Sequence, residues 1–232
     1  MNRYRDSFQP IWEPFCGGLN TAAHHGGLVH CSDIRGDLIG LYKAIAEGWD
    51  PPTEVSQETY ELSLKGDVED PLRSFALYSC SHLGKCGSGY NPGRPRVTKT
   101  RPRAGELIVP QPASAARTSL LRDIPKIASF ECLDFLELEP KPTEYLIYCD
   151  PPYKGVTGYG FSFDHEAFYE RCLQWSEYTT VLVSEYDLPI GRCVSELERA
   201  SNIHNKTRPR RTTEKIYLIG DGIVSRRPWE LV

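Results

Sequence analysis

The sequence predicts an α/β protein with a Rossmann-like, doubly wound and mostly parallel sheet. Three observations support this fold class. Short apolar segments alternate with segments of helical spacing, the pair Gly17-Gly18 follows the first apolar segment, and the second apolar segment ends at the carboxylate of Asp33. A strand, a glycine turn, a helix and a second strand that ends in an acid are typical of a nucleoside-binding site.

The first elements lie close together in the chain. Residues 11–16 are apolar and run into Gly17-Gly18, which predicts a strand, a glycine turn and the start of a helix. Residues 28–33 predict a second strand. Residues 38–46 have apolar side chains at helical spacing and predict a helix.

The character of the chain changes after residue 50. Pro51-Pro52 ends the first helix, and a polar segment of helical spacing follows over residues 57–64. Residues 79–103 are rich in Gly, Pro, Ser and basic residues and show little periodicity. We therefore expect residues 49–104 to be an inserted lobe in a main domain formed by residues 1–48 and 105–232.

The remaining core elements follow the insertion. A continuous apolar run over residues 145–149 ends at Asp150 and suits a central buried strand. A helix should begin after Asp164, a plausible N-cap, and continue to about residue 178. Further strands are expected over residues 130–135, 179–184 and 215–219.

Composition excludes several classes of protein. The 232 residues include 27 basic and 31 acidic ones, for a net charge of −4, and 40% hydrophobic residues support a substantial core. No apolar run approaches the ~20 residues of a membrane span, and the polar first ten residues do not form a signal peptide. The eight cysteines contain no C-x-x-C pair and the six histidines complete no zinc spacing. We expect a cytoplasmic protein with reduced thiols, no metal and no membrane association.

Basic residues gather in two short stripes. Residues 94–103 carry Arg94, Arg96, Lys99, Arg101 and Arg103 without an acid, and residues 206–211 carry four more basic side chains. Such stripes can bind phosphates even on an acidic protein. Two solvated loops are the equally simple interpretation.

The tetrapeptide Asp150-Pro151-Pro152-Tyr153 is the strongest chemical candidate. It follows the predicted central strand, at the carboxyl edge where open α/β sheets bind ligands. An aromatic amine is a poor nucleophile until two acceptors hold its hydrogens, and the Asp150 carboxylate and the Pro151 carbonyl can be those acceptors. The prolines hold the turn rigid, so that the amine can be aligned with a reactive carbon.

Tyr153 offers an aromatic face to a base. Stacking on an aromatic ring is worth ~1–3 kcal/mol per base, which offsets part of the few kcal/mol needed to extrude a base from a duplex. Taken by itself, the tetrapeptide would also fit a Pro-Pro turn without chemistry.

Further segments add a family resemblance. Together with the tetrapeptide, they resemble the Dam-type, alpha-class adenine-specific DNA methyltransferases, especially the compact phage members, over most of the chain. The matching segments are Glu13-Pro14-Phe15-Cys16-Gly17-Gly18, Ser32-Asp33-Ile34, residues 130–135, residues 148–155 with Thr157-Gly158-Tyr159, residues 163–168, Ser184-Glu185-Tyr186 and residues 213–216.

The resemblance implies S-adenosylmethionine as the cofactor. In the family, the first motif and the acid after the second strand bind the cofactor, the acid through the ribose hydroxyls, and the Asp-Phe pair after the third strand lies near the cofactor adenine. The implied cofactor-binding residues are Glu13, Pro14, Phe15, Cys16, Gly17, Gly18, Asp33, Ile34, Asp134 and Phe135.

The resemblance also implies the reaction and the partner. The catalytic residues would be Asp150, Pro151, Pro152 and Tyr153, which would methylate the N6 amine of a flipped adenine in double-stranded DNA. The inserted lobe would be the target-recognition region. Its candidate DNA contacts are Lys85, Tyr90, Asn91 and the basic residues of 94–103, to which Lys154 in the main domain is added. A monomer or weak dimer in a bacterial or phage-infected cell, serving phage or restriction–modification biology, is expected.

Two alternatives stay open. The family has a Gly-Gly-Lys or Gly-Ser-Lys triplet before the first motif, and no such triplet precedes Glu13 in this sequence. A catalytically impaired nucleic-acid-binding protein on a methyltransferase fold would accommodate that departure. The other alternative is a different acceptor, such as cytosine or RNA. A protein glutamine is disfavoured because its enzymes begin the tetrapeptide with Asn.

Overall fold

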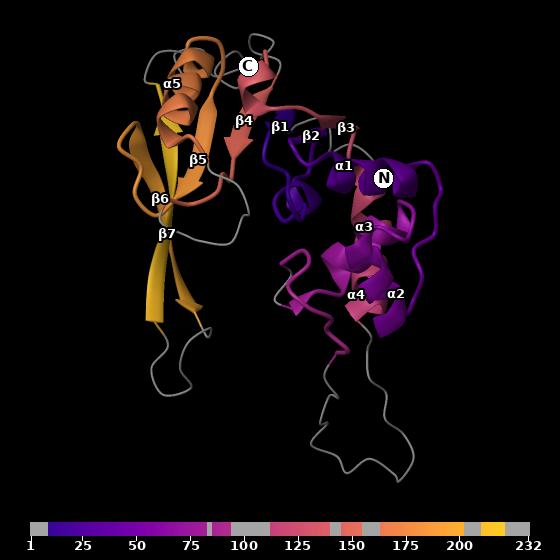
Figure 1. Ribbon diagram of the computed structural model, residues 1–232. Coiled ribbons are helices and arrows are strands. Elements are labelled where there is room, and N and C mark those ends of the chain that lie inside the picture. The colour runs from indigo at the N-terminus through magenta and orange to yellow at the C-terminus, as the bar shows by residue number, and fades with distance from the viewer. Residues whose placement is uncertain are drawn as a thin grey trace. The chain divides into compact units, whose positions relative to one another are not determined.

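The computed structural model describes residues 9–82, 85–93, 112–139, 145–154, 163–201 and 210–220. The chain divides into two compact units (Figure 1). The first comprises Met1–Ile34 and Glu131–Val232, and the second comprises Arg35–Phe130. The predicted insertion, residues 49–104, falls within the second unit, and its role in target recognition stays a prediction.

A seven-stranded sheet forms the framework of the protein and confirms the predicted α/β fold class. Its strands lie in the order β3-β2-β1-β4-β5-β7-β6. β1 pairs in parallel with β2 and β4, and β4 pairs in parallel with β5. β7 runs antiparallel to β5 and β6. The bounds are β1 Ile11–Glu13, β2 Val29–Asp33, β3 Ser129–Cys132, β4 Leu146–Cys149, β5 Val181–Glu185, β6 Arg192–Ser201 and β7 Arg210–Ile219.

The strand order fixes where a ligand can bind. From β1 the chain order runs outward through β2 and β3 on one side, and from β4 through β5 on the other. The order therefore reverses between β1 and β4. In open α/β sheets, the carboxyl ends of the strands at such a switch point form the ligand crevice.

Helix α5, His165–Ser176, follows the sequence expectation closely. The carboxylate of Asp164 accepts hydrogen bonds from the backbone N–H groups of Glu166 and Ala167 at 3.1 and 3.0 Å, which makes it the predicted N-cap. Trp175 is buried in the core of the first unit with residues of β4, β5 and β7. Its indole N–H donates to the Leu138 carbonyl at 3.0 Å.

The first unit differs from expectation in two places. The helix expected after Gly17-Gly18 is only a 3-10 turn, η2 (Ala22–His24), because the backbone first makes a tight turn in which Leu19 adopts φ +59°. β6 was not predicted, and β7 begins five residues before the expected residue 215. The described side chains of β6 are exposed, so this strand lacks the apolar alternation that reveals a strand in a sequence.

The second unit is helical. α1 (Gly36–Ala46) and α2 (Gln57–Lys65) match the expected helices, whereas α3 (Leu72–Ser79) and α4 (Pro112–Asp123) were not predicted. A 3-10 turn of this unit, η4 (Ile124–Lys126), precedes β3, and η5 (Phe135–Glu137), which belongs to the first unit, follows it in the chain. Of α4 only Ala113 and Asp123 are buried, so its sequence carries almost no apolar stripe.

The Asp164 cap gives a test of the local fold. We expect Asp164→Ala to lower the free energy of unfolding by about 1 kcal/mol, because two N–H groups lose their acceptor. Chemical denaturation measures the change. Asp164→Asn should stay close to wild type, since Asn caps as well as Asp, and equal losses in both variants would contradict the capping role.

Candidate functional site

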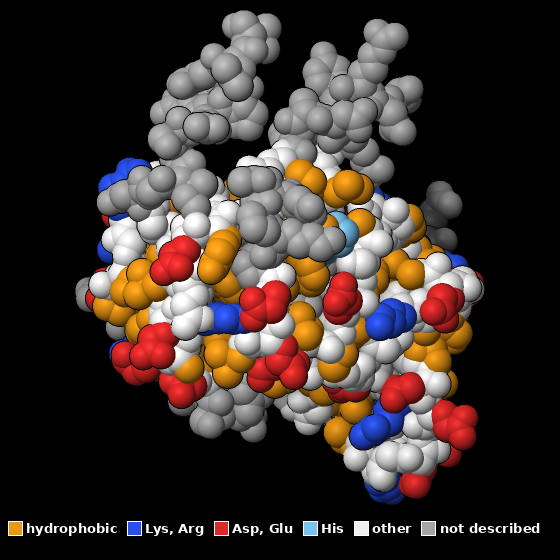
Figure 2. Space-filling view, turned by 90° about the horizontal axis from the view of Figure 1, so that it is seen from above, with side chains coloured by type: hydrophobic (Ala, Val, Ile, Leu, Met, Phe, Trp, Pro, Cys, Tyr) orange, Lys and Arg blue, Asp and Glu red, His pale blue; other side chains and the backbone are white. Residues whose placement is uncertain are grey.

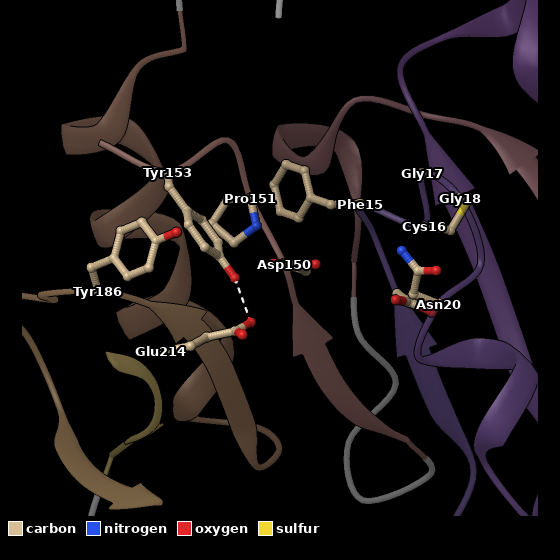
Figure 3. Close-up of a pocket in the computed structure, with 11 residues that line it drawn as sticks. Phe15, Cys16, Gly17, Gly18, Asn20, Asp150, Pro151, Tyr153, Tyr186 and Glu214 are labelled. Carbon is tan, nitrogen blue, oxygen red and sulfur yellow. Dashed lines mark hydrogen bonds between the residues drawn. The ribbon is translucent and has the colours of Figure 1, made fainter. Parts of the chain in front are cut away.

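A cavity of about 410 Å³ lies at the switch point of the sheet, within the first unit. The turn after β1 supplies one wall and the segment after β4 supplies another (Figure 3). Its lining residues are Glu13, Phe15, Cys16, Gly17, Gly18, Asn20, Asp150, Pro151, Tyr153, Tyr186 and Glu214. The structure thus brings five of the predicted cofactor-binding residues together with three of the four predicted catalytic ones.

The carboxyl group of Glu13 is the most unusual group in this cavity. Glu13 is 2% exposed, and its Oε2 atom has no hydrogen-bond partner among the described residues. Burial raises the pKa of Glu13 to about 8, the neighbouring Asp150 carboxylate adds to the rise, and a hydrogen bond from the Ala22 backbone N–H opposes it. With Glu214, three carboxyl groups line the cavity, so it favours a ligand that carries positive charge.

The glycine turn is held by the acid at the end of β2. The Gly17 N–H donates to Oδ2 of Asp33 at 3.1 Å, and Gly17 adopts φ +39°, a backbone conformation that side-chain-bearing residues rarely adopt. The Cys16 N–H donates to the Ser32 carbonyl at 3.0 Å. A hydrogen bond to Cys31, together with burial, raises the pKa of Cys16, which therefore faces the cavity as a neutral thiol.

The other predicted cofactor-binding residues lie outside the cavity lining. Pro14, Asp33, Ile34, Asp134 and Phe135 are not among the lining residues. Asp134 caps η5, where its carboxylate accepts from the Leu136 N–H at 2.9 Å. Phe135 packs on Phe15 with ring centroids 5.4 Å apart, so it adjoins the cavity through a residue that lines it.

The segments that carry these residues still lie side by side. The N–H of Leu133, just after β3, donates to the carbonyl of Asp33 at 3.1 Å. The ends of β2 and β3 therefore present Asp33 and Asp134 next to each other along the sheet edge that holds the glycine turn. Both carboxylates accept backbone hydrogen bonds there, Asp33 from the Gly17 N–H and Asp134 from the Leu136 N–H, and their role in cofactor binding stays a prediction.

Tyr153 is fixed by neighbours on two strands. Its hydroxyl donates to Oε1 of Glu214 on β7 at 2.8 Å (Figure 3). The same hydroxyl lies 2.8 Å from Oγ of Ser184 on β5. Burial raises the pKa of Tyr153, so the phenol stays protonated. Its ring meets the ring of Tyr186 edge to face, with centroids 4.8 Å apart. Pro152 is the one tetrapeptide residue that does not line the cavity.

Sequence reasoning missed three residues that line the cavity, Asn20, Tyr186 and Glu214. Glu185, which follows a central strand and was a possible site residue, does not line the cavity but accepts a hydrogen bond from the backbone N–H of Lys154 at 3.2 Å. Tyr186 and Glu214 lie in segments that resemble the methyltransferase family, but the resemblance did not indicate that their side chains line the cavity. Glu214 reaches the site because β7 pairs antiparallel with β5, a strand order that a single sequence does not reveal.

The predicted DNA contacts fall into two groups. Lys85 is exposed, whereas Tyr90 and Asn91 are half-buried, with the Tyr90 hydroxyl donating to the Val55 carbonyl at 2.8 Å and Oδ1 of Asn91 accepting from the Gly93 N–H at 3.0 Å. Lys154 is exposed beside the tetrapeptide. The others, Arg94, Arg96, Lys99, Arg101 and Arg103, lie outside the described residues, as does Thr157-Gly158-Tyr159.

The described surface shows no concentration of positive charge in the view of Figure 2. Acidic and basic side chains are interspersed there, and the described Lys and Arg side chains do not gather into one patch. In the part of the chain that the structure describes, no three His, Cys, Asp or Glu side chains are grouped as metal ligands. No described helix is both long and apolar enough to cross a membrane.

No family model and no curated protein sequence matches this chain. Similar solved structures include the rRNA methyltransferase AviRa from Streptomyces viridochromogenes, at 11% identity over 90% of this chain and 76% of that chain, with a TM-score of 0.35. A Listeria monocytogenes protein assigned to the class I S-adenosylmethionine-dependent methyltransferases is 12% identical over 94% of this chain and 56% of that chain (TM-score 0.34). A protein assigned as a methyltransferase and complexed with SAH is 10% identical over 95% and 49% (TM-score 0.33).

The raised pKa of Glu13 predicts how stability depends on pH. The pKa of Glu13 is about 8 in the folded protein, whereas in the unfolded chain the carboxyl group has its ordinary pKa of 4.5. This group therefore contributes stability that is complete below about pH 4.5 and is lost as the pH rises to about 8.

Denaturation at several pH values between about 5 and 8 tests this. We expect Glu13→Gln, which cannot ionise, to flatten the decline in unfolding free energy over this range. Glu131→Gln, on exposed β3 surface, should leave the slope as in wild type. A wild-type slope that Glu13→Gln does not change would show that Glu13 titrates normally.

Proposed function

We propose that this protein is an S-adenosylmethionine-dependent methyltransferase that modifies the exocyclic N6 amine of adenine in DNA. The observation that carries the proposal is the meeting of the first-motif turn, Glu13 to Gly18, with Asp150, Pro151 and Tyr153 in one cavity at the switch point. A donor held by the turn would face an acceptor held by the tetrapeptide. This juxtaposition is what a group transfer between two bound molecules requires.

The cavity suits the methyl donor on chemical grounds. S-adenosylmethionine carries a sulfonium and an ammonium cation, and Glu13 offers a buried oxygen without a partner. A cation beside Glu13 and Asp150 would satisfy that oxygen and favour the ionised form of both acids. When bound, the donor supplies an electrophilic methyl group. The residues that would hold it are those of the turn, with Asp33 and Asp134 on the adjoining strand ends.

The tetrapeptide suits an amine acceptor. Asp150 and Pro151 both line the cavity, and the carboxylate of one and the carbonyl of the other would be two acceptors for the two hydrogens of one amino group. Holding those hydrogens draws the nitrogen toward tetrahedral geometry and exposes its lone pair. A nitrogen held in this way would be directed at the methyl group that the bound donor supplies, and Asp150 could accept the proton that the methylated nitrogen loses.

Adenine in DNA is the acceptor that the combined features favour. Tyr153 and Tyr186 supply aromatic surface to an extruded base, and an exposed Lys154 next to the tetrapeptide is placed to meet a phosphate. The resemblance of the motifs to Dam-type enzymes specifies adenine within that class. Cytosine or RNA would use the same chemistry and are outcomes that the acceptor experiments below distinguish.

Replacement of Asp150 tests the catalytic assignment. We expect Asp150→Ala to lower the turnover number for transfer of a labelled methyl group to duplex DNA by at least about 100-fold. Losses of this size follow when a hydrogen-bonding group that stabilises the transition state is removed from an active site. DNA binding, measured by fluorescence anisotropy, should change little. Glu177→Gln, at the exposed end of α5, is the matched surface control and should keep wild-type turnover.

Two results would contradict the assignment. One is near-normal turnover of Asp150→Ala with the same DNA. The other is a wild-type protein that shows no heat of binding on calorimetric titration with S-adenosylmethionine, which would favour the alternative of a nucleic-acid-binding protein without catalysis.

A further inference from the structure

Three side chains from separate elements converge on one point beside the cavity. Tyr153 follows β4, Ser184 is on β5 and Glu214 is on β7. The Tyr153 hydroxyl donates to Oε1 of Glu214 at 2.8 Å, and the Ser184 hydroxyl donates to the same oxygen at 3.0 Å. The two hydroxyl oxygens lie 2.8 Å apart. Each oxygen in this cluster therefore contacts both of the others.

The chemistry of the cluster makes Glu214 its acceptor. Two hydroxyl groups bring two hydrogens to three oxygen–oxygen contacts, and an ionised carboxylate has no hydrogen to donate. Oε1 of Glu214 can take both hydrogens, as a charge-assisted acceptor. Ser184 is fully buried, so its position is set by the sheet and does not adjust to solvent. The Tyr153 hydroxyl is thus held at a fixed point.

The ring of Tyr153 is also restrained against rotation and displacement. Tyr186 meets it edge to face at 4.8 Å and an interplanar angle of 79°. Glu185 is buried and directly precedes Tyr186. Its carboxylate accepts hydrogen bonds from the backbone N–H of Lys154 at 3.2 Å and from the backbone N–H of Tyr186 at 2.8 Å. One carboxylate therefore holds the backbone next to Tyr153 and the backbone of Tyr186.

We propose that Glu214 is a positioning residue, which together with Ser184 presents the face of Tyr153 at the angle needed to stack the acceptor base. Glu214 acts through Tyr153 and does not touch the reacting atoms. The role rests on the proposed function, because it assumes an aromatic acceptor in the cavity. A ring already held in place loses little freedom when the base stacks on it, so the stacking energy is retained.

Four variants test the role of Glu214: Glu214→Ala, Glu214→Gln, Tyr153→Phe and the double variant of Glu214→Ala with Tyr153→Phe. We expect Glu214→Ala to lower kcat/KM for DNA by roughly tenfold, because part of the stacking energy between the base and the Tyr153 ring would be lost. Glu214→Gln should recover most of the activity, because its amide oxygen still accepts from Tyr153. The measurements use saturating S-adenosylmethionine, so that the loss of one of the three cavity carboxyl groups in the Glu214 variants does not enter the comparison. The affinity of Tyr153→Phe for S-adenosylmethionine, measured by calorimetry, should stay within about twofold of wild type.

The double variant separates positioning from a general structural role. If Glu214 acts through the Tyr153 hydroxyl, kcat/KM of the double variant should be no lower than that of the less active single variant, because each change breaks the same hydrogen bond. Glu196→Ala, exposed on β6 in the same hairpin, is the control for damage to the strands and should behave as wild type. Thermal melting confirms that each variant is folded.

The outcomes distinguish this inference from the proposed function. Additive losses in the double variant, or wild-type kinetics of Glu214→Ala, would overturn the positioning role while leaving the methyltransferase assignment intact. If the wild type methylates cytosine or RNA instead of adenine, the adenine assignment fails and the same variants are measured with that acceptor. A wild-type protein that transfers no methyl group to any of the three would overturn both.

Discussion

The parallel pairing of β1 with β4 is the constraint on which the rest of the structure depends. It sets Ile11 beside Leu146 and Trp12 beside Ile147. The segments that follow the two strands therefore leave the sheet at the same edge. One strand ends at Glu13, and the other leads directly into Asp150. The buried Glu13 and the half-buried Asp150 are thereby placed close to each other, which costs stability unless a proton or a cation compensates. In the free protein the compensation is the proton that Glu13 retains to about pH 8.

That cost gives the site its selectivity. A cavity lined by the carboxyl groups of Glu13, Asp150 and Glu214 favours a cationic ligand, and Oε2 of Glu13, which has no hydrogen-bond partner among the described residues, offers a place for it. The sulfonium of a methyl donor is a cation that is consumed by the reaction, because transfer of the methyl group leaves a neutral thioether. The same acids that favour binding of the donor would therefore favour release of the product.

The antiparallel end of the sheet supports the side of the cavity that Tyr153 lines. β7 inserts between β5 and β6 and carries Glu214 to the hydroxyl of Tyr153. Figure 1 shows β6 and β7 as a long hairpin of the first unit. The hairpin thus contributes the side chain of Glu214, which lies in the middle of β7, whereas the parallel strands contribute the residues at their carboxyl ends.

The sequence predicted the parts of the site that follow directly from a strand. The apolar run before Asp150, the acid that ends β2 and the capping Asp164 each carry a local pattern, and the structure confirms these elements. It did not predict β6, whose described side chains are exposed, or α4, which buries only two residues. Glu214 and Tyr186 could not be placed either, because their roles arise from the pairing of β5 with β7 and from a contact between rings. Both are tertiary properties without a local pattern.

The central claim is that this cavity transfers a methyl group to the N6 amine of adenine in DNA. The most direct test is to incubate the wild-type protein with labelled S-adenosylmethionine and a duplex library of mixed sequence, and then to map the modified bases. Label on N6 of adenine within a defined sequence context is the result expected. Label confined to cytosine, or transfer to RNA but not to the duplex library, would contradict it.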